Sequence, residues 1–415
     1  MNIAIVGTGI SGLVSAYLLN RTHNVTIFEA NDYIGGHTCT VDVPTPRGAV
    51  AVDTGFIVFN ENTYPNFIKL IDQLGVAWQP SDMSFSVQCE KTGLVFSPST
   101  FNSLFAQRAN LLRPRFYRML LDALRFRRES AGLIGQTEDG TTLAAYLQEN
   151  GYSPGFVDNL IVPMGAAIWS ADPERFMDFP VHYLAAFFHN HGFLNIKDQP
   201  RWCTIRGGSR QYVGPLVRSF HGRIRLNSPV AQIQRRSDGV TIALGDTSRH
   251  AFDQVVIAAH ADQALRMLAD PSDREAQILG AIGYQENLTV LHTDTRLMPS
   301  KHAAWASWNY RIPKQAMGRV ALTYHMNRLQ TLTCPEQFCV TLNMPEAIDA
   351  QKRISTLVYH HPVYDPKGLA ARRRRAEISG VNRTWFCGAY WGYGFHEDGV
   401  NSALVVGREF GKELP

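Results

Sequence analysis

Three glycines and one acid near the start of the chain have the types and spacing that bind a dinucleotide. Gly7, Gly9 and Gly12 lie in the sequence GTGISG, which permits a tight turn, a close backbone approach to a pyrophosphate, and close packing of a helix on a strand. The start of the following helix would present unpaired N–H groups to the phosphates. Glu29 could accept hydrogen bonds from a ribose diol and would repel a 2′-phosphate. These residues therefore predict a dinucleotide without a 2′-phosphate.

A strand, a helix and a second strand must position this turn. Residues 2–6 form a short apolar run rich in β-branched side chains, and residues 25–28 form another that ends at Glu29. A glycine-rich turn alone is weak evidence, because a Rossmann-like turn can lack a nucleotide. The strand before it, the helix after it and the acid after the second strand are the context that the motif requires.

Length and composition limit the class of protein. A chain of 415 residues exceeds one ordinary core and indicates two interleaved domains. Hydrophobic content of 45% and charged content of 18% are typical of a globular protein, and no apolar stretch is long enough to span a bilayer. Six cysteines without a CxxC pair argue against a zinc site or disulfide framework, so we expect no metal and a cytoplasmic protein. A net charge of +4 without a recognised module argues against nucleic-acid binding.

Several further segments resemble, in order, the flavoprotein superfamily of amine oxidases and phytoene desaturases. They span almost the whole chain and comprise residues 35–38 (GGHT), 53–55 (DTG), 206–209 (RGGS), 228–230 (SPV), 252–260 (FDQVVIAAH), 385–389 (WFCGA) and 397–403 (EDGVNSA). His37 stands where the family usually has an arginine, which would alter contacts to the pyrophosphate.

The resemblance implies FAD as the cofactor. Members with covalent flavin have a cysteine upstream of the last strand, and none lies between Cys339 and Cys387, so we expect non-covalent FAD. The residues that the motifs assign to the cofactor are Gly7, Gly9, Ile10, Ser11, Gly12, Glu29, Ala30, Gly36, His37, Thr38, Gly55, Phe56, Val230, Gly388, Ala389, Gly399, Val400 and Ser402.

The order of the motifs predicts an α/β fold with a discontinuous Rossmann-like FAD-binding domain and a mixed α+β substrate domain, as in amine oxidases. Both ends of the chain carry cofactor motifs, so they must meet in space. The FAD domain is expected from residues 1–60, 205–265 and 380–415. The substrate domain is expected from 62–204 and 266–379, with a helical part at 62–200, a strand pair near 83–96, and a sheet part at 285–345 with strand-like runs at 288–293, 319–325 and 338–342.

Aromatic residues near the C-terminus are candidates to enclose the flavin ring. Residues 390–397 (YWGYGFHE) gather four aromatic side chains beside a histidine and an acid, although several of these rings could simply pack the domain interface. The ring needs a dry pocket that holds a C–H bond against it, and a base must take a proton. The candidate catalytic residues are His396, Glu397, Tyr393 and Asn287, with His292 and His325 as weaker candidates for the base.

The predicted substrate depends on a narrower resemblance. Many amine oxidases carry a lysine on the sheet of the substrate domain, whereas residues 283–292 (GYQENLTVLH) offer Gln285 or Asn287 and no lysine. Residues 324–330, 340–343, 361–362 and 387–399 look like a bacterial group of predicted NAD/FAD-binding proteins that are commonly encoded beside cyclopropane-fatty-acid synthase-like methyltransferases. Some members are linked to dehydrogenation of methylated unsaturated acyl chains on the route to furan fatty acids. The resemblance implies a desaturase of a lipid or fatty acyl substrate.

Two basic segments of the sequence are candidate contact surfaces for a partner. Residues 111–128 (LLRPRFYRMLLDALRFRR) place Phe116, Met119, Leu120, Ala123 and Leu124 at helical spacing, with arginines between them. Such a helix could make peripheral contact with an anionic membrane on its inner face, or it could pack its apolar face on the core. The run 372–375 is expected to be a solvated helix face.

Other functions remain open from the sequence alone. An FAD-dependent oxidase of amines or another small molecule would have a compact polar pocket. A non-catalytic flavin- or partner-binding protein would bind FAD that no lipid reduces, and redox-neutral isomerisation is a further possibility. A separate NAD(P)H site is not expected, because no second GxGxxG has strand context. The oligomeric state is left open.

Overall fold

Five strands from distant parts of the chain form one parallel sheet in the computed structural model, which describes residues 1–135, 140–192 and 200–415. Residues of β1 alternate between two cores, because successive side chains of a strand point to opposite faces. Both faces are covered, which explains the continuous apolar run. The strands are, in spatial order, β10 (Arg223–Arg225), β2 (Asn24–Phe28), β1 (Asn2–Val6), β14 (Gln254–Ile257) and β20 (Thr384–Phe386).

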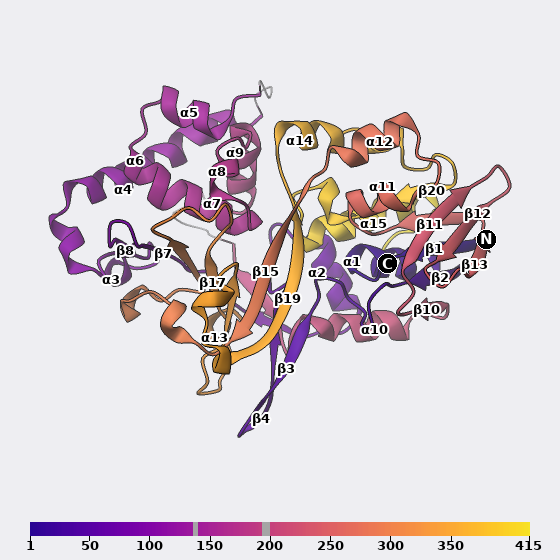
Figure 1. Cartoon of the computed structure of the whole chain (residues 1–415), viewed down its shortest axis with the longest axis horizontal. Helices are drawn as coiled ribbons and strands as arrows, with labels where there is room; N and C mark the ends of the chain where they lie inside the picture. Colours follow the sequence, from indigo (N-terminus) through magenta and orange to yellow (C-terminus); the bar gives the residue numbers. More distant parts are fainter. Residues whose placement is uncertain (136–139, 193–199) are drawn as a thin grey trace.

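Helices cover one face of this sheet, and a small antiparallel sheet with two helices covers the other (Figure 1). The first face packs against α1 (Ile10–Leu19), α2 (Pro65–Gln73), α10 (Val213–Arg218) and α15 (His396–Glu409). The second face packs against β11 (Val230–Arg235), β12 (Val240–Leu244), β13 (Arg249–Phe252), α11 (Ala261–Met267) and α12 (Asp273–Gly280). Both termini lie in this lobe (Figure 1), so the two ends of the chain meet as the motif order requires.

A seven-stranded sheet forms the centre of the second lobe. Its strands are, in order, β19 (Arg353–Pro362), β15 (Tyr284–His292), β18 (Cys339–Leu342), β17 (Leu322–His325), β16 (Trp308–Ile312), β7 (Phe85–Cys89) and β8 (Val95–Phe96). The expected runs correspond to β15, β17 and β18, and the expected strand pair corresponds to β7 and β8. The sequence analysis missed β16 and β19.

Helices pack on this sheet around a core rich in phenylalanine. They are α3 (Phe101–Leu104), α4 (Pro114–Ser130), α5 (Leu143–Glu149), α6 (Pro154–Phe156), α7 (Val162–Trp169), α8 (Pro173–Phe176) and α9 (Val181–Asn190), while α13 (Met326–Leu329) and α14 (Pro366–Arg372) follow β17 and β19. Within the described residues, no helix combines the length and apolar character needed to cross a membrane.

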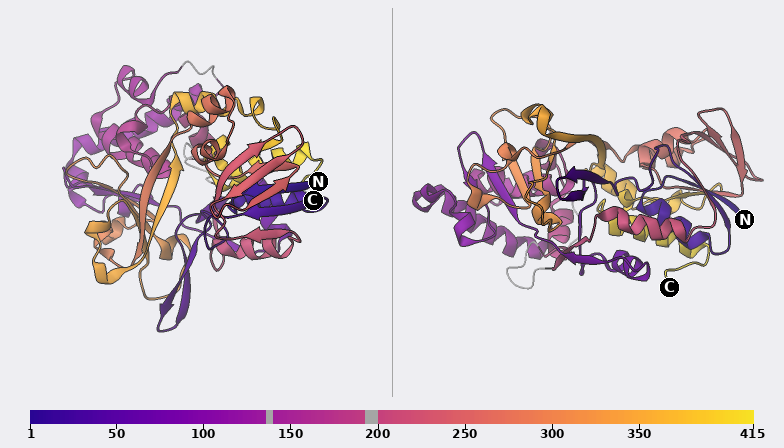
Figure 2. Two further views of the ribbon diagram at one scale, coloured as in Figure 1. Left: turned by 45° about the vertical axis from the view of Figure 1, so that its right-hand side comes forward. Right: turned by 90° about the horizontal axis from the view of Figure 1, so that it is seen from below.

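Two small sheets join the lobes. The strands β5 (Val58–Asn60), β9 (Trp202–Ile205) and β6 (Trp78–Pro80) form one, and the hairpin β3 (Thr40–Thr45) with β4 (Gly48–Asp53) forms the other. The left view of Figure 2 shows the hairpin extending away from the body of the molecule. The strands of the parallel sheet lie within the three segments assigned to the FAD domain, whereas the domain boundaries stay predictions.

The structure shows which side chains of the two basic segments, residues 111–128 and 372–375, are buried. In α4, Phe116, Met119 and Phe126 are buried in the core, whereas Leu124, which was predicted on the same apolar face, is 55% exposed. The prediction of a solvated face was wrong for Arg372, which is buried and donates hydrogen bonds from Nε to the Tyr390 carbonyl (2.7 Å) and from Nη2 to the Val363 carbonyl (2.9 Å). The sequence could not reveal these long-range carbonyl acceptors.

Candidate active site

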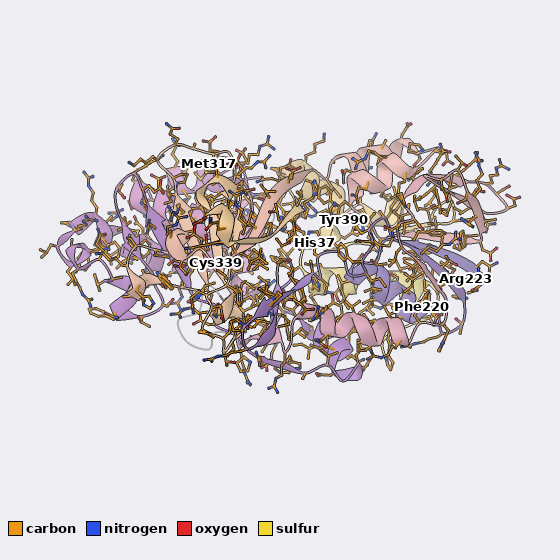
Figure 3. All side chains as sticks on the ribbon, turned by 60° about the horizontal axis from the view of Figure 1, so that its bottom comes forward. His37, Phe220, Arg223, Met317, Cys339 and Tyr390 are labelled. Carbon is orange, nitrogen blue, oxygen red and sulfur yellow. The ribbon has the colours of Figure 1, made fainter. Side chains whose placement is uncertain are left out.

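A cavity of about 810 Å³ lies between the two lobes and is lined by residues of both. This volume lies within the range of small-molecule and cofactor sites. Figure 3 shows His37 and Tyr390, which both line the cavity, near the middle of the molecule. The cavity therefore lies where the fold brings together the N-terminal glycine turn and the segment after β20.

The three glycines of the turn have separate structural requirements. Gly7 has φ of +102°, and a Cβ there would lie 2.7 Å from the Ala258 carbonyl oxygen. A Cβ on Gly12 would lie 2.0 Å from the Gly7 oxygen, so this glycine permits close packing of α1 on the turn. A Cβ on Gly9 would meet no atom within 4 Å, and Gly9 lines the cavity. The open space over Gly9 fits a pyrophosphate at the N-terminus of α1.

Glu29 is buried at the end of β2 and lines the cavity. One carboxylate oxygen accepts hydrogen bonds from Thr8 N (2.9 Å) and Thr8 Oγ1 (2.5 Å), and the other accepts from Asn31 N and Nδ2 (both 2.9 Å). A carboxylate offers about four lone-pair sites, so a ribose hydroxyl would have to replace one of these donors. The ribose contact stays a prediction.

Most residues assigned to the cofactor line this one cavity. Those on its wall are Gly7, Gly9, Ile10, Ser11, Glu29, Ala30, Gly36, His37, Gly55, Phe56, Val230, Gly388 and Ala389. Gly12, Thr38, Gly399, Val400 and Ser402 are not among the lining residues and lie behind the wall. Ser402 Oγ accepts a hydrogen bond from Gly388 N (2.9 Å), and a Cβ on Gly399 would lie 2.6 Å from Ile10 Cγ2. These residues position the wall and pack α15 against α1.

His396 lines the cavity at the first turn of α15. Its Nε2 lies 3.0 Å from the Tyr212 hydroxyl and 3.2 Å from Thr38 Oγ1. The ring stacks on Phe56 with a centroid distance of 3.6 Å and an interplanar angle of 11°. Burial holds the pKa of His396 well below its usual range, so the imidazole is neutral near pH 7. Tyr212, which the sequence analysis did not single out, thus fixes the orientation of this ring.

Glu397 and Tyr393 do not line the cavity in the described structure. The Glu397 carboxylate accepts hydrogen bonds from the backbone N–H groups of Asn66 (3.1 Å) and Phe67 (2.8 Å), at the N-terminus of α2. The Tyr393 ring packs on Tyr183, with a centroid distance of 4.6 Å. The geometry therefore gives Glu397 a helix-capping role and Tyr393 a packing role, and their catalytic roles stay untested predictions.

Asn287 lies directly behind the cavity wall. Its Nδ2 donates to the Ser170 carbonyl (3.2 Å) and to His361 Nδ1 (3.0 Å), and its Oδ1 accepts from Asn343 Nδ2 (2.7 Å). Ser170 and His361 line the cavity, so Asn287 positions lining residues from β15.

The two weaker candidates for the base have hydrogen-bond partners within the second lobe. His292 is buried in β15 with Nε2 2.7 Å from Thr341 Oγ1, and His325 Nε2 lies 2.8 Å from Gln337 Oε1. Neither histidine is among the lining residues. Of the proposed bases, His396 alone lines the described cavity.

The second lobe contributes a group of apolar and aromatic side chains to the cavity. The sequence analysis did not single out these side chains as a group, because they come from separate elements and carry no local motif. They are Met83, Ile168, Phe187, Trp308, Tyr324, Leu342 and Val358, and the same lobe also contributes the polar side chains of Ser170, His191, Tyr284, Tyr359, His360 and His361 to the lining. Among the described lining residues, Glu29 is the single carboxylate, and it belongs to the other lobe.

Comparisons with known proteins agree with this geometry. The family model described as flavin containing amine oxidoreductase matches residues 10–304. The 15-cis-phytoene desaturase of Arabidopsis thaliana is 25% identical over 300 residues, covering 65% of this chain and 50% of that protein. The L-amino-acid oxidase of Siganus canaliculatus is 24% identical over 319 residues, covering 70% and 56%. The chain thus spans about half the length of these curated relatives.

Two solved structures share the whole architecture. A CLA-producing fatty acid isomerase from P. acnes has a TM-score of 0.70 at 17% identity, and covers 98% of both chains. Cyclohexylamine oxidase from Brevibacterium oxydans IH-35A has a TM-score of 0.70 at 18% identity, and covers 99% of both. These likenesses confirm the predicted amine oxidase-like fold. The family match, together with the glycine turn and cavity that suit a flavin cofactor, shows that this chain belongs to the flavin containing amine oxidoreductases.

Proposed function

We propose that this chain is an FAD-dependent oxidoreductase that removes hydrogen from a C–C unit of a lipid acyl chain. The observation that carries the proposal is the apolar lining contributed by the second lobe. A buried CH₂ group gains about 0.8 kcal/mol, so Ile168, Leu342 and Val358 favour an alkyl chain. FAD is the proposed cofactor because the open space at Gly9 adjoins α1, and it is proposed to be non-covalent.

The sequence resemblance narrows the proposed substrate to a methylated or otherwise modified unsaturated acyl chain. The fatty acid isomerase and the phytoene desaturase support a lipid substrate by their names, whereas the amine oxidases favour the alternative of an amine or another small molecule. The described wall of the second lobe offers no carboxylate to an ammonium group. This absence in the described lining favours the lipid.

Different residues of the chain would have different roles in such a dehydrogenation. Bound FAD supplies a two-electron acceptor for the hydride. His396 is the candidate base for the proton that leaves the substrate, because its neutral ring lines the cavity. Tyr212 and Thr38 orient this ring through Nε2. The apolar side chains exclude water and hold the acyl chain, while Asn287 fixes His361 and Ser170.

A surface of exposed leucines and arginines supports peripheral contact with an anionic membrane on the cytoplasmic side. Phe101 is 74% exposed, Leu112 88%, Leu121 63% and Leu124 55%. Arginines of α4 lie among these side chains and would attract anionic headgroups. Of the predicted apolar face of α4, Phe116 and Met119 are buried, whereas Leu124 belongs to this exposed surface. The proposed contact would place the enzyme beside its lipid substrate.

Anaerobic reduction of the bound flavin tests the proposed function. The absorbance at about 450 nm should bleach with phospholipids carrying methylated unsaturated acyl chains, and it should persist with primary amines and polyamines. Val358→Asp, which places a carboxylate on the apolar wall, should slow bleaching by lipid while FAD stays bound. Val405→Asp is a matched control, because Val405 is similarly exposed on α15 and does not line the cavity.

The outcomes of the flavin-reduction experiment distinguish the proposed function from its alternatives. Bleaching by amines alone would overturn the lipid proposal. Lipid conversion with no net reduction of the flavin would indicate isomerisation. A flavin that neither class of compound reduces, with no conversion of lipid, would indicate a non-catalytic flavin-binding protein.

A further inference from the structure

Four histidines from three separate elements gather on one wall of the cavity. His37 follows the glycine pair after β2, His260 follows β14, and His360 and His361 lie on β19. The ring centroids of His37 and His260 are 6.0 Å apart, those of His37 and His361 are 5.7 Å apart, and those of His260 and His360 are 6.1 Å apart. The rings are therefore close enough to share one ligand group.

This histidine cluster adjoins the turn that would hold a pyrophosphate. His37 directly follows Gly36, where a Cβ would lie 3.1 Å from Gly9 Cα. His260 lies two residues after Ala258, whose carbonyl oxygen closely faces Gly7. The open space over Gly9 is thus flanked by the segments that carry both histidines.

The wall offers little permanent positive charge to an anion. Arg266 is the single arginine among the described lining residues, which include no lysine, and its Nη1 lies 2.7 Å from Asp262 Oδ2. The diphosphate of FAD carries two negative charges. The dipole of α1 supplies only a partial positive charge at its N-terminus. A further cation on this wall would compensate more of the diphosphate charge.

His37, His260 and His361 are neutral before an anion binds. Burial lowers the pKa of His37 and of His260 to about 4, and that of His361 to about 3, and mutual repulsion among the rings acts in the same direction. Other titratable groups face them from several elements. These are Glu29 after β2, Tyr33 and Cys39 in the following loop, Asp262 and Arg266 on α11, Tyr284 and Glu286 on β15, Tyr359 on β19, and His396 on α15.

The carboxylates near the cluster do not act as counter-charges to His37 and His260 in place of a diphosphate. Asp262 pairs with Arg266, Glu29 already accepts four hydrogen bonds, and Glu286 lies 3.9 Å from the more exposed His360. Tyr359 and Tyr284 keep their protons, because burial raises the pKa of both phenols. A bound diphosphate would therefore be the dominant anion near His37 and His260.

We propose that the histidine cluster supplies the positive charge for the diphosphate of FAD, so that FAD binding takes up a proton from solvent. This inference rests on the proposed use of FAD. A nearby anion favours the protonated imidazole, so binding raises the affinity of the cluster for the proton. Linkage then requires FAD to bind more tightly as pH falls.

The direction of the pH dependence of FAD binding, and the pH range in which it occurs, follow from the protonation of the cluster without and with FAD. His37 and His260 lose their protons near pH 4 without FAD, and under this proposal they would lose them at a higher pH with FAD bound. Between these values the complex holds more protons than the free protein. The Kd for FAD should rise about tenfold per pH unit where one proton is taken up, and should level off above the pKa of the complex.

Titration calorimetry of the full chain with FAD, ADP and riboflavin, in buffers of different ionisation enthalpy from pH 5.5 to 8.5, tests the inference. FAD and ADP should take up a proton on binding, whereas riboflavin, which lacks phosphate, should take up none. His37→Gln and, as a second variant, His260→Gln should each reduce the proton uptake and flatten the pH dependence of the FAD Kd. His221→Gln is the matched control on the exposed surface.

The outcomes distinguish this inference from the proposed function. Failure of FAD to bind at any pH would overturn both. FAD binding with a Kd independent of pH would overturn the histidine proposal alone. Equal proton uptake with riboflavin would also overturn it, since the proton would then respond to the flavin ring.

Discussion

Adding one methyl group at Gly9 should weaken cofactor binding without unfolding the protein. Gly9 is the N-cap of α1, with φ of −61° and ψ of 175°, a conformation that alanine readily adopts. The alanine Cβ would meet no protein atom within 4 Å. It would instead occupy the open space in which a pyrophosphate approaches the backbone.

The expected magnitudes of Gly9→Ala follow from this geometry. The free energy of unfolding of the apoprotein should change by less than about 1 kcal/mol, because alanine is a poorer N-cap but reduces the entropy of the unfolded chain. Overpacking by a methyl group costs about 1–3 kcal/mol, so the Kd for FAD should rise roughly 5- to 150-fold. Urea unfolding and titration of flavin fluorescence measure the two quantities.

Gly12→Ala is the contrasting variant in the same motif. Its Cβ would lie 2.0 Å from the Gly7 carbonyl oxygen, so the backbone must move and the apoprotein should lose about 3 kcal/mol of stability. If Gly9→Ala bound FAD with unchanged affinity, the assignment of the open space to the pyrophosphate would be refuted. If Gly9→Ala destabilised the apoprotein as much as Gly12→Ala, the steric reasoning itself would fail.

Three other perturbations have measurable outcomes. Because the neutral, partly buried His37 and His260 have lowered pKa values, the apoprotein should lose up to about 1.4 kcal/mol per histidine per pH unit as pH falls from ~6.5 toward 4. Urea midpoints at several pH values would show no such loss if the rings were already charged. Leu121→Ser and Leu124→Ser should each weaken co-sedimentation with anionic vesicles about tenfold without changing stability, and unaltered binding would contradict the membrane proposal. Glu397→Ala should lower the free energy of unfolding by about 1–3 kcal/mol by leaving N–H groups of α2 unpaired, and a loss of activity with unchanged stability would instead favour a catalytic role.

The cofactor half of the site could be predicted from the sequence because its requirements are local. Gly7 needs a positive φ, Gly12 must pack against the turn, and Gly9 must leave open space, so three positions in six residues are constrained. The same locality explains why β1 and β2 were predicted: both are short, buried and continuously apolar. The position of Glu29 at the end of β2 follows directly from these elements.

The rest of the site depends on contacts that no local pattern encodes. β19 lies at the edge of its sheet with half-exposed side chains, so its sequence has no continuous apolar run, and yet it carries His360 and His361. Glu397 is one residue from the cavity-lining His396, but the helical turn directs its carboxylate to α2. The exposed Leu121 and Leu124 could not be distinguished from the buried Phe116, Met119 and Phe126, because both faces of the helix carry apolar residues.

The free-energy cost of burying a charged group distinguishes amine substrates from lipid substrates better than the shape of the cavity does. An alkylammonium group loses several kcal/mol of hydration on burial, and the described lining of the second lobe provides no carboxylate to replace that hydration. The aromatic faces of Trp308 and Tyr324 could return about 2 kcal/mol through cation–π contact, which is too little alone. An acyl chain carries no such cost, and each buried CH₂ group adds about 0.8 kcal/mol. Lengthening an unsaturated acyl substrate by two carbons should therefore lower its Kd about tenfold while its chain still fits the apolar wall, whereas a Kd independent of chain length would refute this account.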